Sequence, residues 1–153
     1  MFQRILVGLD GSNHGLNAAR AAIALAVRFE SELHLLTVTR PYKVNPELRR
    51  YLEAENLLGE PKYVLDEMTD RIVSEARELA LAAGVARVTA AVREGKPARA
   101  LIDYASTHRI GLLVVGSRGV GEVEAALLGS VSQKAALLAK CTVMVARGPA
   151  EGV

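Results

Sequence analysis

A glycine-rich segment near the end of the chain has the residue types and spacing of an anion-binding loop. In "VVGSRGVGEVEAALLGSVSQ", residues 114–133, two residues separate Gly116 from Gly119, and nine more separate Gly119 from Gly129. Glycines let the main chain approach a ligand because no Cβ stands in the way. The "GSVS" that begins at Gly129 opens a predicted helix, whose unpaired N–H groups and two hydroxyls suit an anion. The pattern G-x-x-G-x₉-G-S therefore predicts a phosphate site.

Two widespread phosphate motifs fit this segment poorly. A P-loop needs G-x-x-x-x-G-K-[ST]; Gly116 and Gly121 have that separation, but Glu122 stands where the lysine belongs. A dinucleotide fingerprint, G-x-G-x-x-G, would begin at Gly119, but Glu124 replaces its third glycine and the segment lies late in the chain. The P-loop is thus excluded, and the fingerprint is a weak match.

The elements that must position this loop alternate along the chain. Short apolar runs predict five buried strands, at residues 5–7, 32–39, 88–92, 111–116 and 141–146. Helices are predicted between them. The first is capped by Ser12, the second begins at Val64 with an apolar face of Leu65, Met68, Ile72, Ala76, Leu79 and Ala83, the third begins at Pro97, and the last contains Val131, Ala135 and Leu138. Prolines and charges in residues 40–63 predict a mobile excursion with room for one short helix.

This alternation predicts an α/β fold. We expect one doubly wound domain over residues 1–147 with a five-stranded parallel sheet, strand order 3-2-1-4-5, and helices on both faces, followed by a short tail at 148–153. In such sheets ligands bind at the carboxyl ends of the strands, where the strand order reverses. The candidate loops are therefore "GLDGS" after the first strand, residues 38–40 after the second and "GSRGVG" after the fourth.

Two charged residues in these loops each have two interpretations. Asp10 is a suitable acceptor for sugar hydroxyls, but an aspartate there is also typical of a turn or a helix cap. Arg118 is a suitable phosphate partner, but it is equally compatible with a solvated loop. Ser12 fits a helix cap better than a ligand contact.

Composition limits the remaining possibilities. The chain has 153 residues, a formal net charge of +2 and one cysteine. This charge balance argues against nucleic acid or a membrane surface as partner, and Cys141 reads as a small core residue. We see no apolar run long enough to span a bilayer and no signal peptide, so we expect a cytoplasmic protein. His14, His34 and His108 show no metal-ligand spacing and are expected at surface or capping positions.

The sequence resembles the universal stress protein family over nearly its whole length. The resemblance is carried by "ILVGLDGS" at the start, "LHLLTV" in the second strand, "REGKPARALIDYA" before the fourth, and "LLVVGSRG" with "LLGSVSQKAALLAKCTVMV" at the end. The nucleotide-binding branch of the family carries the same G-x-x-G-x₉-G-[ST] motif, and the branch that does not bind ATP lacks it.

The resemblance implies a dimeric ATP-binding regulator of the stress response. Asp10 would face the ribose or adenine, and the main chain of Val38 would bond the adenine edge. The residues expected around the triphosphate, with the neighbours that complete the site, are Gly8, Leu9, Val115, Gly116, Arg118, Gly119, Gly129, Ser130, Val131 (through its main chain) and Ser132. ATP, with Mg²⁺, is the implied cofactor. The last strand, about residues 142–147, would pair with a second copy to form a homodimer.

The chain departs from the family pattern at four positions. Glu122 and Glu124 place negative charge inside the loop, Thr142 stands where proline is usual, and Gly111 stands where aspartate is frequent. The two glutamates keep open an alternative function, a dimeric interaction module of the same fold without nucleotide. An ATPase or phosphotransferase is less favoured, because the loop has neither a P-loop lysine nor an evident general base; at most we expect slow hydrolysis. Phosphorylation of Ser130 or Ser132 also stays open.

Overall fold

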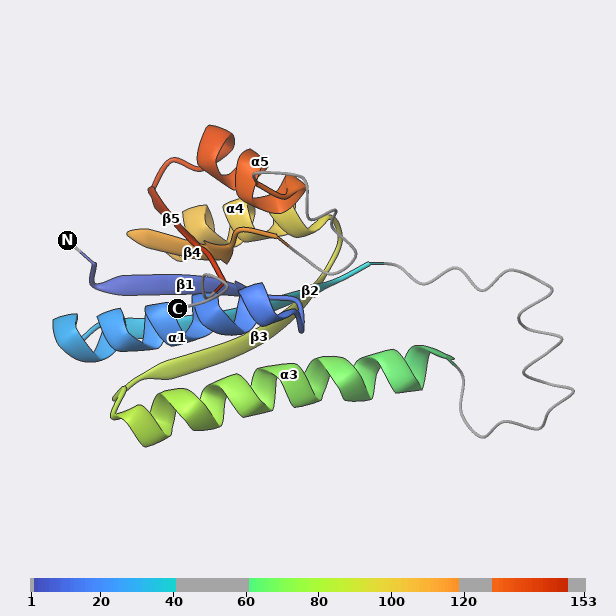
Figure 1. The fold of residues 1–153 in the computed structure, drawn as a ribbon, viewed down its shortest axis with the longest axis horizontal. Helices are drawn as coiled ribbons and strands as arrows, with labels where there is room; N and C mark the ends of the chain where they lie inside the picture. Colours follow the sequence, from blue (N-terminus) through green and yellow to red (C-terminus); the bar gives the residue numbers. More distant parts are fainter. Residues whose placement is uncertain (1, 41–60, 119–127, 149–153) are drawn as a thin grey trace, which may run out of the picture.

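The computed structural model describes residues 2–40, 61–118 and 128–148, without the side chains of 61–66. Strands and helices alternate along these residues (Figure 1). The elements are β1 Arg4–Leu9, α1 Asn13–Phe29, β2 Glu32–Thr39, α3 Pro61–Ala83, β3 Val88–Glu94, α4 Pro97–Thr107, β4 Leu112–Gly116, α5 Ser130–Leu138 and β5 Thr142–Ala146. The predicted excursion at 40–63 falls almost entirely outside the described residues.

The five strands form one parallel sheet in the order β3-β2-β1-β4-β5, as predicted. The apolar runs explain this arrangement, because a central strand of a parallel sheet is covered on both faces. In β1, Ile5, Leu6 and Val7 are all fully buried. The sheet grows from β1 to β2 and β3 on one side, and then continues with β4 and β5 on the other side of β1. The strand order therefore reverses at β1, which places the expected binding crevice beside this strand.

The helices cover the two faces of the sheet in pairs. α1 and α3 pack on one face and α4 and α5 on the other (Figure 1). Successive side chains of a strand point to opposite faces, so Ile5 and Val7 join the core under α1 and α3, while Leu6 joins the core under α4 and α5. Cys141 packs against the second core, in agreement with its expected role, and burial raises the pKa of its thiol.

Several element boundaries differ from the sequence expectation. β1 spans Arg4–Leu9 rather than 5–7, and β5 begins at Thr142 rather than at 141. β3 continues to Glu94 because Arg93 and Glu94 still pair with the end of β2. β4 begins at Leu112 rather than at 111; the N–H of Gly111 donates to the carbonyl of Arg4 at 3.0 Å. α3 begins at Pro61, three residues before the predicted start, because proline is well tolerated in the first turn of a helix.

The predicted cap of the first helix is confirmed. The Ser12 hydroxyl accepts a hydrogen bond from the N–H of Gly15 at 3.0 Å, at the start of α1. Glu30 ends this helix in the left-handed conformation, with φ 54°. The cap matters for the site, because it fixes the turn between β1 and α1 at the carboxyl edge of the sheet.

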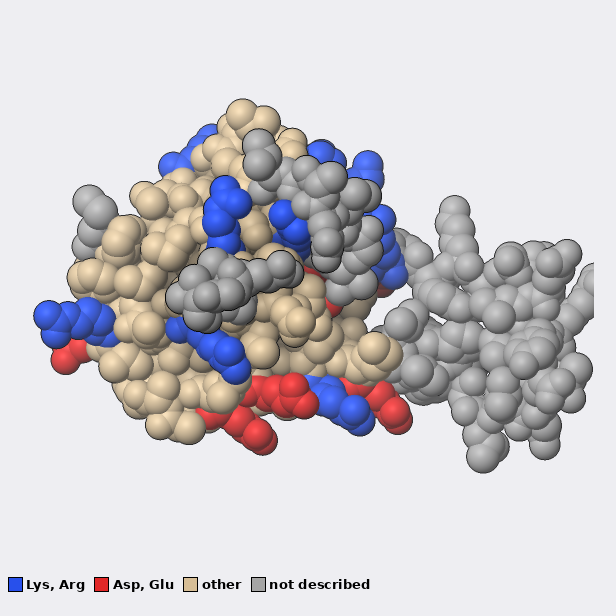
Figure 2. Space-filling model, in the orientation of Figure 1, with Lys and Arg blue, Asp and Glu red and all other residues tan. Residues whose placement is uncertain are grey.

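The exposed side of α3 carries charges of both signs, visible along the lower edge of the molecule (Figure 2). Glu67, Asp70, Arg71, Glu75 and Arg77 are all exposed there. Such mixing gives this face no single sign of charge. Within residues 2–40, 61–118 and 128–148, no helix combines the length and apolar character needed to cross a bilayer.

Candidate functional site

A crevice opens at the carboxyl edge of the sheet where β1 and β4 separate. The register of these strands runs from Ile5↔Leu112 to Val7↔Val114. Gly8 and Leu9 continue β1 beyond that point, paired with β2 alone. The connection from β1 runs through α1 on one face of the sheet, and the connection into β4 runs through α4 on the other face. These helices diverge at this edge and leave space between them.

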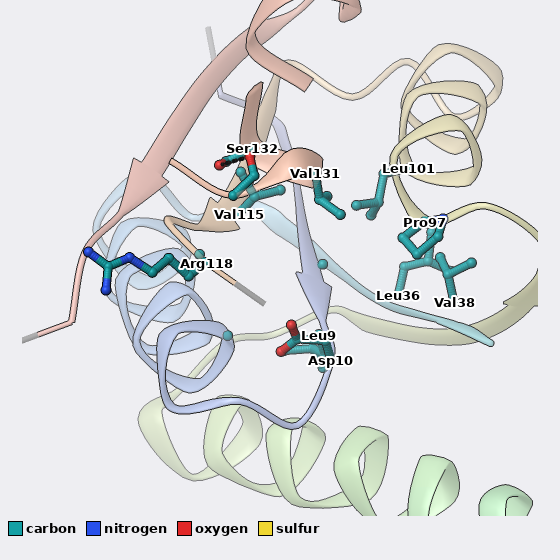
Figure 3. Close-up of a pocket in the computed structure, with 14 residues that line it drawn as sticks. Leu9, Asp10, Leu36, Val38, Pro97, Leu101, Val115, Arg118, Val131 and Ser132 are labelled. Atoms are coloured by element: carbon teal, nitrogen blue, oxygen red, sulfur yellow. Dashed lines mark hydrogen bonds between the residues drawn. The ribbon is translucent and has the colours of Figure 1, made fainter. Parts of the chain in front are cut away.

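This space is an open cleft of about 530 Å³ (Figure 3). The ends of β1, β2 and β4 and the starts of α4 and α5 supply its walls. The lining residues are Gly8, Leu9, Asp10, Gly15, Leu36, Val38, Pro97, Leu101, Val115, Gly116, Arg118, Gly129, Val131 and Ser132.

The cleft has an apolar wall and a polar end. The apolar wall consists of Leu36, Val38, Pro97, Leu101 and Val131, which gather on one side in Figure 3. Asp10 lies across from this wall, beside Leu9. The polar end, named here the phosphate end, consists of Gly116, Gly129 and Ser132. A flat apolar group and a hydrophilic group would each find a matching surface.

Most of the predicted site residues line this cleft. Those brought together are Gly8, Leu9, Asp10, Val38, Val115, Gly116, Arg118, Gly129, Val131 and Ser132. Ser130 is not among the lining residues, and Gly119, with Glu122 and Glu124, lies outside the described residues.

Four lining residues were missed from the sequence: Gly15, Leu36, Pro97 and Leu101. Two spacings in the sequence pointed to three of these residues, all but Gly15. Leu36 lies two residues before Val38 and thus on the same face of β2. Pro97 and Leu101 lie four residues apart, on one face of α4. What the sequence lacked was the packing of α4 over the end of β2.

Asp10 has the turn role that one of its two interpretations predicted, and its contact with a sugar stays a prediction. Its Oδ1 accepts hydrogen bonds from the N–H of Ser12 at 2.9 Å and from the Ser12 hydroxyl at 2.5 Å, so it closes the turn. It is also exposed at the cleft. Gly15 lies against this carboxylate, since a Cβ on Gly15 would be 2.7 Å from Oδ1. The turn therefore holds the aspartate in a fixed position at the cleft.

The reason for glycine at 116 differs from the sequence expectation. A Cβ at Gly116 would lie 2.8 Å from the carbonyl carbon of His14 and 2.9 Å from its oxygen. The close approach that demands glycine is thus between the end of β4 and the first turn of α1. Gly116 packs two elements together and does not only make room for a ligand.

Arg118 lines the cleft, but its guanidinium group does not point into it. Figure 3 shows the side chain running away from Asp10 and the apolar wall, toward α1. Its Nε is buried and has no hydrogen-bond partner among the described residues. A phosphate contact by Arg118 remains a prediction and requires another rotamer.

The start of α5 is partly committed to internal hydrogen bonds, which corrects the expected set of free donors. The N–H of Gly129 donates to the carbonyl of Ser117 at 2.6 Å. The Ser132 hydroxyl donates to the carbonyls of Ser117 and Gly129, at 3.2 and 2.9 Å, and Ser132 is 1% exposed. The N–H groups of Val131 and Ser132 precede the first helical bond, which Gln133 makes to Gly129. These groups are the donors that α5 can offer an anion, and the burial of Ser132 argues against its phosphorylation.

The expectation that all three histidines lie at surface or capping positions is wrong for His34. Its ring is 4% exposed and lies at the amino edge of the sheet, with Nδ1 2.7 Å from the Tyr104 hydroxyl and Nε2 3.0 Å from Glu32 Oε1. Burial lowers the pKa of His34, and Glu32 partly offsets the effect. Burial also raises the pKa of Tyr104.

The other two histidines hold elements together. His108 ends α4, stacks on Tyr104 with ring centroids 3.8 Å apart and lies 5.7 Å from the ring of His34. His14 Nδ1 lies 3.1 Å from the Ser117 hydroxyl. The described residues contain no group of three or more side chains that could hold a metal ion together.

This fold and cleft define a small α/β protein with a crevice at the strand-order reversal, and comparison with known proteins gives its family. The model of the universal stress protein family matches residues 1–147. The chain belongs to the universal stress protein family.

Two curated relatives match almost end to end. Universal stress protein YxiE of Bacillus subtilis is 32% identical over 96% of this chain and 100% of its own length. A universal stress protein of Thermus aquaticus, from the QAH/OAS sulfhydrylase 3′ region, is 34% identical over 96% of this chain and 100% of its own length.

Two solved structures carry adenine nucleotides. A universal stress protein in complex with cAMP is 28% identical, covers 95% of this chain and 97% of its own, and superimposes with a TM-score of 0.70. A family member from Arabidopsis thaliana with AMP bound has a TM-score of 0.67 at 20% identity, covering 98% of this chain and 94% of its own; at that identity it shows the shared fold.

Proposed function

We propose that this chain binds an adenine nucleotide, ATP with Mg²⁺, in the cleft and acts as a dimeric regulator of the stress response. One observation carries the proposal: a single cleft joins an apolar wall, a fixed carboxylate and the open start of a helix. These surfaces suit a base, a sugar and a phosphate group respectively. The related structures with cAMP and AMP support the same ligand class. A cytoplasmic location stays a prediction.

The main chain at the end of β2 offers a way to recognise adenine. Glu32 donates its N–H to the residue before β1, whereas Leu33 donates to the residue before β3. Because successive peptide groups alternate in direction, Val38 faces the β1 side, as Glu32 does. The register of β1 with β2 ends at Leu9↔Thr37, so the Val38 carbonyl lies past that ladder at the cleft. A carbonyl there accepts from the 6-amino group of adenine and repels the 6-oxo group of guanine.

The phosphate end suits an anion. Gly129 precedes α5 without a side-chain cap, and the N–H groups of Val131 and Ser132 lie at the start of the helix, where its dipole attracts negative charge. Asp10 is placed to accept ribose hydroxyls from the opposite side. Mg²⁺ usually binds through substrate phosphates with one or two carboxylates, so it would enter with the nucleotide.

The open edge of β5 supports the proposed dimer. β5 pairs with β4 on one side and is the last strand in the sheet order. Ala146 faces β4, because its carbonyl accepts the N–H of Ser117. By the same alternation, Val143 and Val145 direct their peptide groups outward. We expect Val143→Pro to remove an outward N–H, spare the β4 ladder and shift the protein to monomers in analytical ultracentrifugation; an unchanged dimer would place the interface elsewhere.

Nucleotide binding is tested by thermal unfolding and calorimetry. ATP at 100 times its dissociation constant stabilises a folded protein by about 2.7 kcal/mol, which corresponds to a rise in Tm of about 5–10 °C for this size. We expect that shift with ATP and little with GTP. Val131→Phe, which fills the cleft from its apolar wall, should abolish the shift. Val27→Phe, the same change at an exposed position on α1, should retain it.

Two other outcomes would redirect the assignment. If ATP, ADP and AMP all leave Tm unchanged and none co-purifies with the protein, the non-nucleotide interaction module becomes the better description. If the wild type releases phosphate over many turnovers and Val131→Phe does not, the protein is an ATPase or phosphotransferase.

A further inference from the structure

Ser117, the residue after β4, connects four elements around the phosphate end. Its N–H donates to Ala146 of β5 at 2.8 Å. Its carbonyl accepts the N–H of Gly129 and the hydroxyl of Ser132, both at the start of α5. Its own hydroxyl lies 3.1 Å from Nδ1 of His14 in α1. All three of its polar groups are therefore engaged, and Ser117 is 3% exposed.

We propose that Ser117 is a positioning residue for the phosphate end of the cleft, which rests on the nucleotide binding proposed above. It does not contact the ligand. Its carbonyl fixes where α5 begins, and thereby the direction of the first-turn N–H groups that would receive phosphate. Hydrogen-bond donors recognise a charged oxygen only within a narrow range of distance and angle, so this placement controls the affinity for phosphate.

The same geometry gives Ser132 a role other than a phosphate ligand. A hydroxyl has one proton to donate, and that of Ser132 is shared between the carbonyls of Ser117 and Gly129. An anionic oxygen needs a donor, which this hydroxyl no longer offers. Ser132 therefore acts through Ser117, as the second contact that holds the two ends of the glycine-rich segment together.

The His14 contact extends this network to the sugar side of the cleft. His14 lies in the first turn of α1, whose cap Ser12 is bonded to Asp10. Ser117 thus links the carboxylate expected to bind ribose with the helix start expected to bind phosphate. Because Gly116 packs directly on the main chain of His14, the connection is short and has little freedom to deform.

The first test uses the protein without nucleotide. In native-state hydrogen exchange followed by NMR, we expect the Gly129 amide to exchange about two- to tenfold faster than in the wild type in two variants. Ser132→Ala loses the second contact to the Ser117 carbonyl, and Ser117→Ala keeps this carbonyl but loses the contact with His14 that holds it in place. Ser31→Ala is the matched control, because it deletes a buried serine hydroxyl that donates to the carbonyl of Phe2 at the opposite edge of the sheet. It should leave the Gly129 amide unchanged. Equal exchange in all four proteins would overturn the positioning role.

The second test separates positioning from simple loss of stability. By calorimetry, Ser132→Ala, which removes a contact at the start of α5 and none on the sugar side, should weaken AMP and ATP about two- to tenfold and leave adenosine unchanged, because adenosine lacks phosphate. Ser132→Thr, which keeps the hydroxyl, should retain the wild-type affinity for AMP and ATP. Equal losses for adenosine and ATP, or no loss for either, would contradict the proposal. If the wild type binds no adenine nucleotide, the proposed function fails, while the exchange experiment still decides whether Ser117 fixes α5.

Discussion

The interface between β2 and α4 has two ends, and they are built in opposite ways. At the amino edge of the sheet, His34 and Tyr104 meet directly and fill the space between strand and helix. At the carboxyl edge, Leu36, Val38 and Leu101 form the apolar wall of an open cleft. His34, Leu36 and Val38 lie on the same face of one strand, so four residues along the chain separate a sealed end from an open one.

The difference lies in where the polar groups find partners. At the amino edge the polar side chains contact one another: His34 Nδ1 bonds the Tyr104 hydroxyl, Arg4 Nε lies 3.5 Å from Glu32 Oε2, and His108 bonds the carbonyl of Tyr104. At the carboxyl edge, main-chain donors and acceptors border an apolar wall. A buried, pKa-shifted histidine is often taken as a sign of a functional site. Here the buried histidine, His34, belongs to the filled amino edge. The expected binding site lies at the carboxyl edge and relies on the peptide backbone.

The largest expected effect breaks the sealed end. Tyr104→Ala removes a buried ring that stacks on His108 and leaves His34 without its hydroxyl partner. We expect the free energy of unfolding to fall by about 3–5 kcal/mol, as for other buried aromatic truncations. Denaturant unfolding measures the loss, and nucleotide affinity at low temperature should stay close to that of the wild type. A large loss of affinity with little loss of stability would show that the two ends are not independent.

A smaller effect is expected at the rim of the open end. Gly116→Ala forces a Cβ against main-chain atoms of His14, and these atoms cannot move aside as the end of a flexible side chain can. Overpacking of this kind costs about 1–3 kcal/mol and should also weaken nucleotide binding, because it displaces β4 from α1.

Gly84→Ala is the comparison variant for this prediction. Gly84 has a φ of +101°, and a Cβ there would meet nothing within 4 Å. It should lower stability through backbone strain by roughly 1–2 kcal/mol and leave binding unchanged. Equal effects of the two variants on affinity would mean that the contact with His14 does not shape the cleft.

The smallest expected effect is a pH dependence confined to the sealed end. His34 has a pKa below its value of 6.5 in an unfolded chain, mainly because of burial. Between those two values the unfolded state binds the proton more readily, so stability should fall as the pH drops below about 6.5, by at most about 1.4 kcal/mol per pH unit. Glu32 on the same strand faces this ring, as do Arg4, His108 and Tyr104 from the neighbouring elements.

His34→Gln should flatten this part of the stability profile, measured by urea unfolding between pH 5 and 8. Because His34 lies away from the cleft, the variant should leave the pH dependence of nucleotide affinity as it is in the wild type. A stability profile that is the same in both proteins would show that His34 does not titrate in this range.

Periodicity and spacing were enough to predict the elements and a parallel sheet covered on both faces. Continuous apolar runs distinguish buried parallel strands from helices, and the alternation of the two leaves few possible topologies. Once the order 3-2-1-4-5 was expected, the loops containing Asp10, Val38 and Gly116 had to converge at one edge. Their convergence in the structure follows from topology, which local pattern encodes well.

Contacts between distant residues required the folded chain. His34 and Tyr104 are 70 residues apart in sequence, and His14 and Ser117 are 103 apart. Each of these residues taken alone matches a surface or turn position. Only the packing of α4 over β2, and of α1 against the end of β4, made His34 a core residue and Ser117 a junction. Side-chain pairing of this kind depends on the distance and angle between elements, which no local pattern of residues specifies.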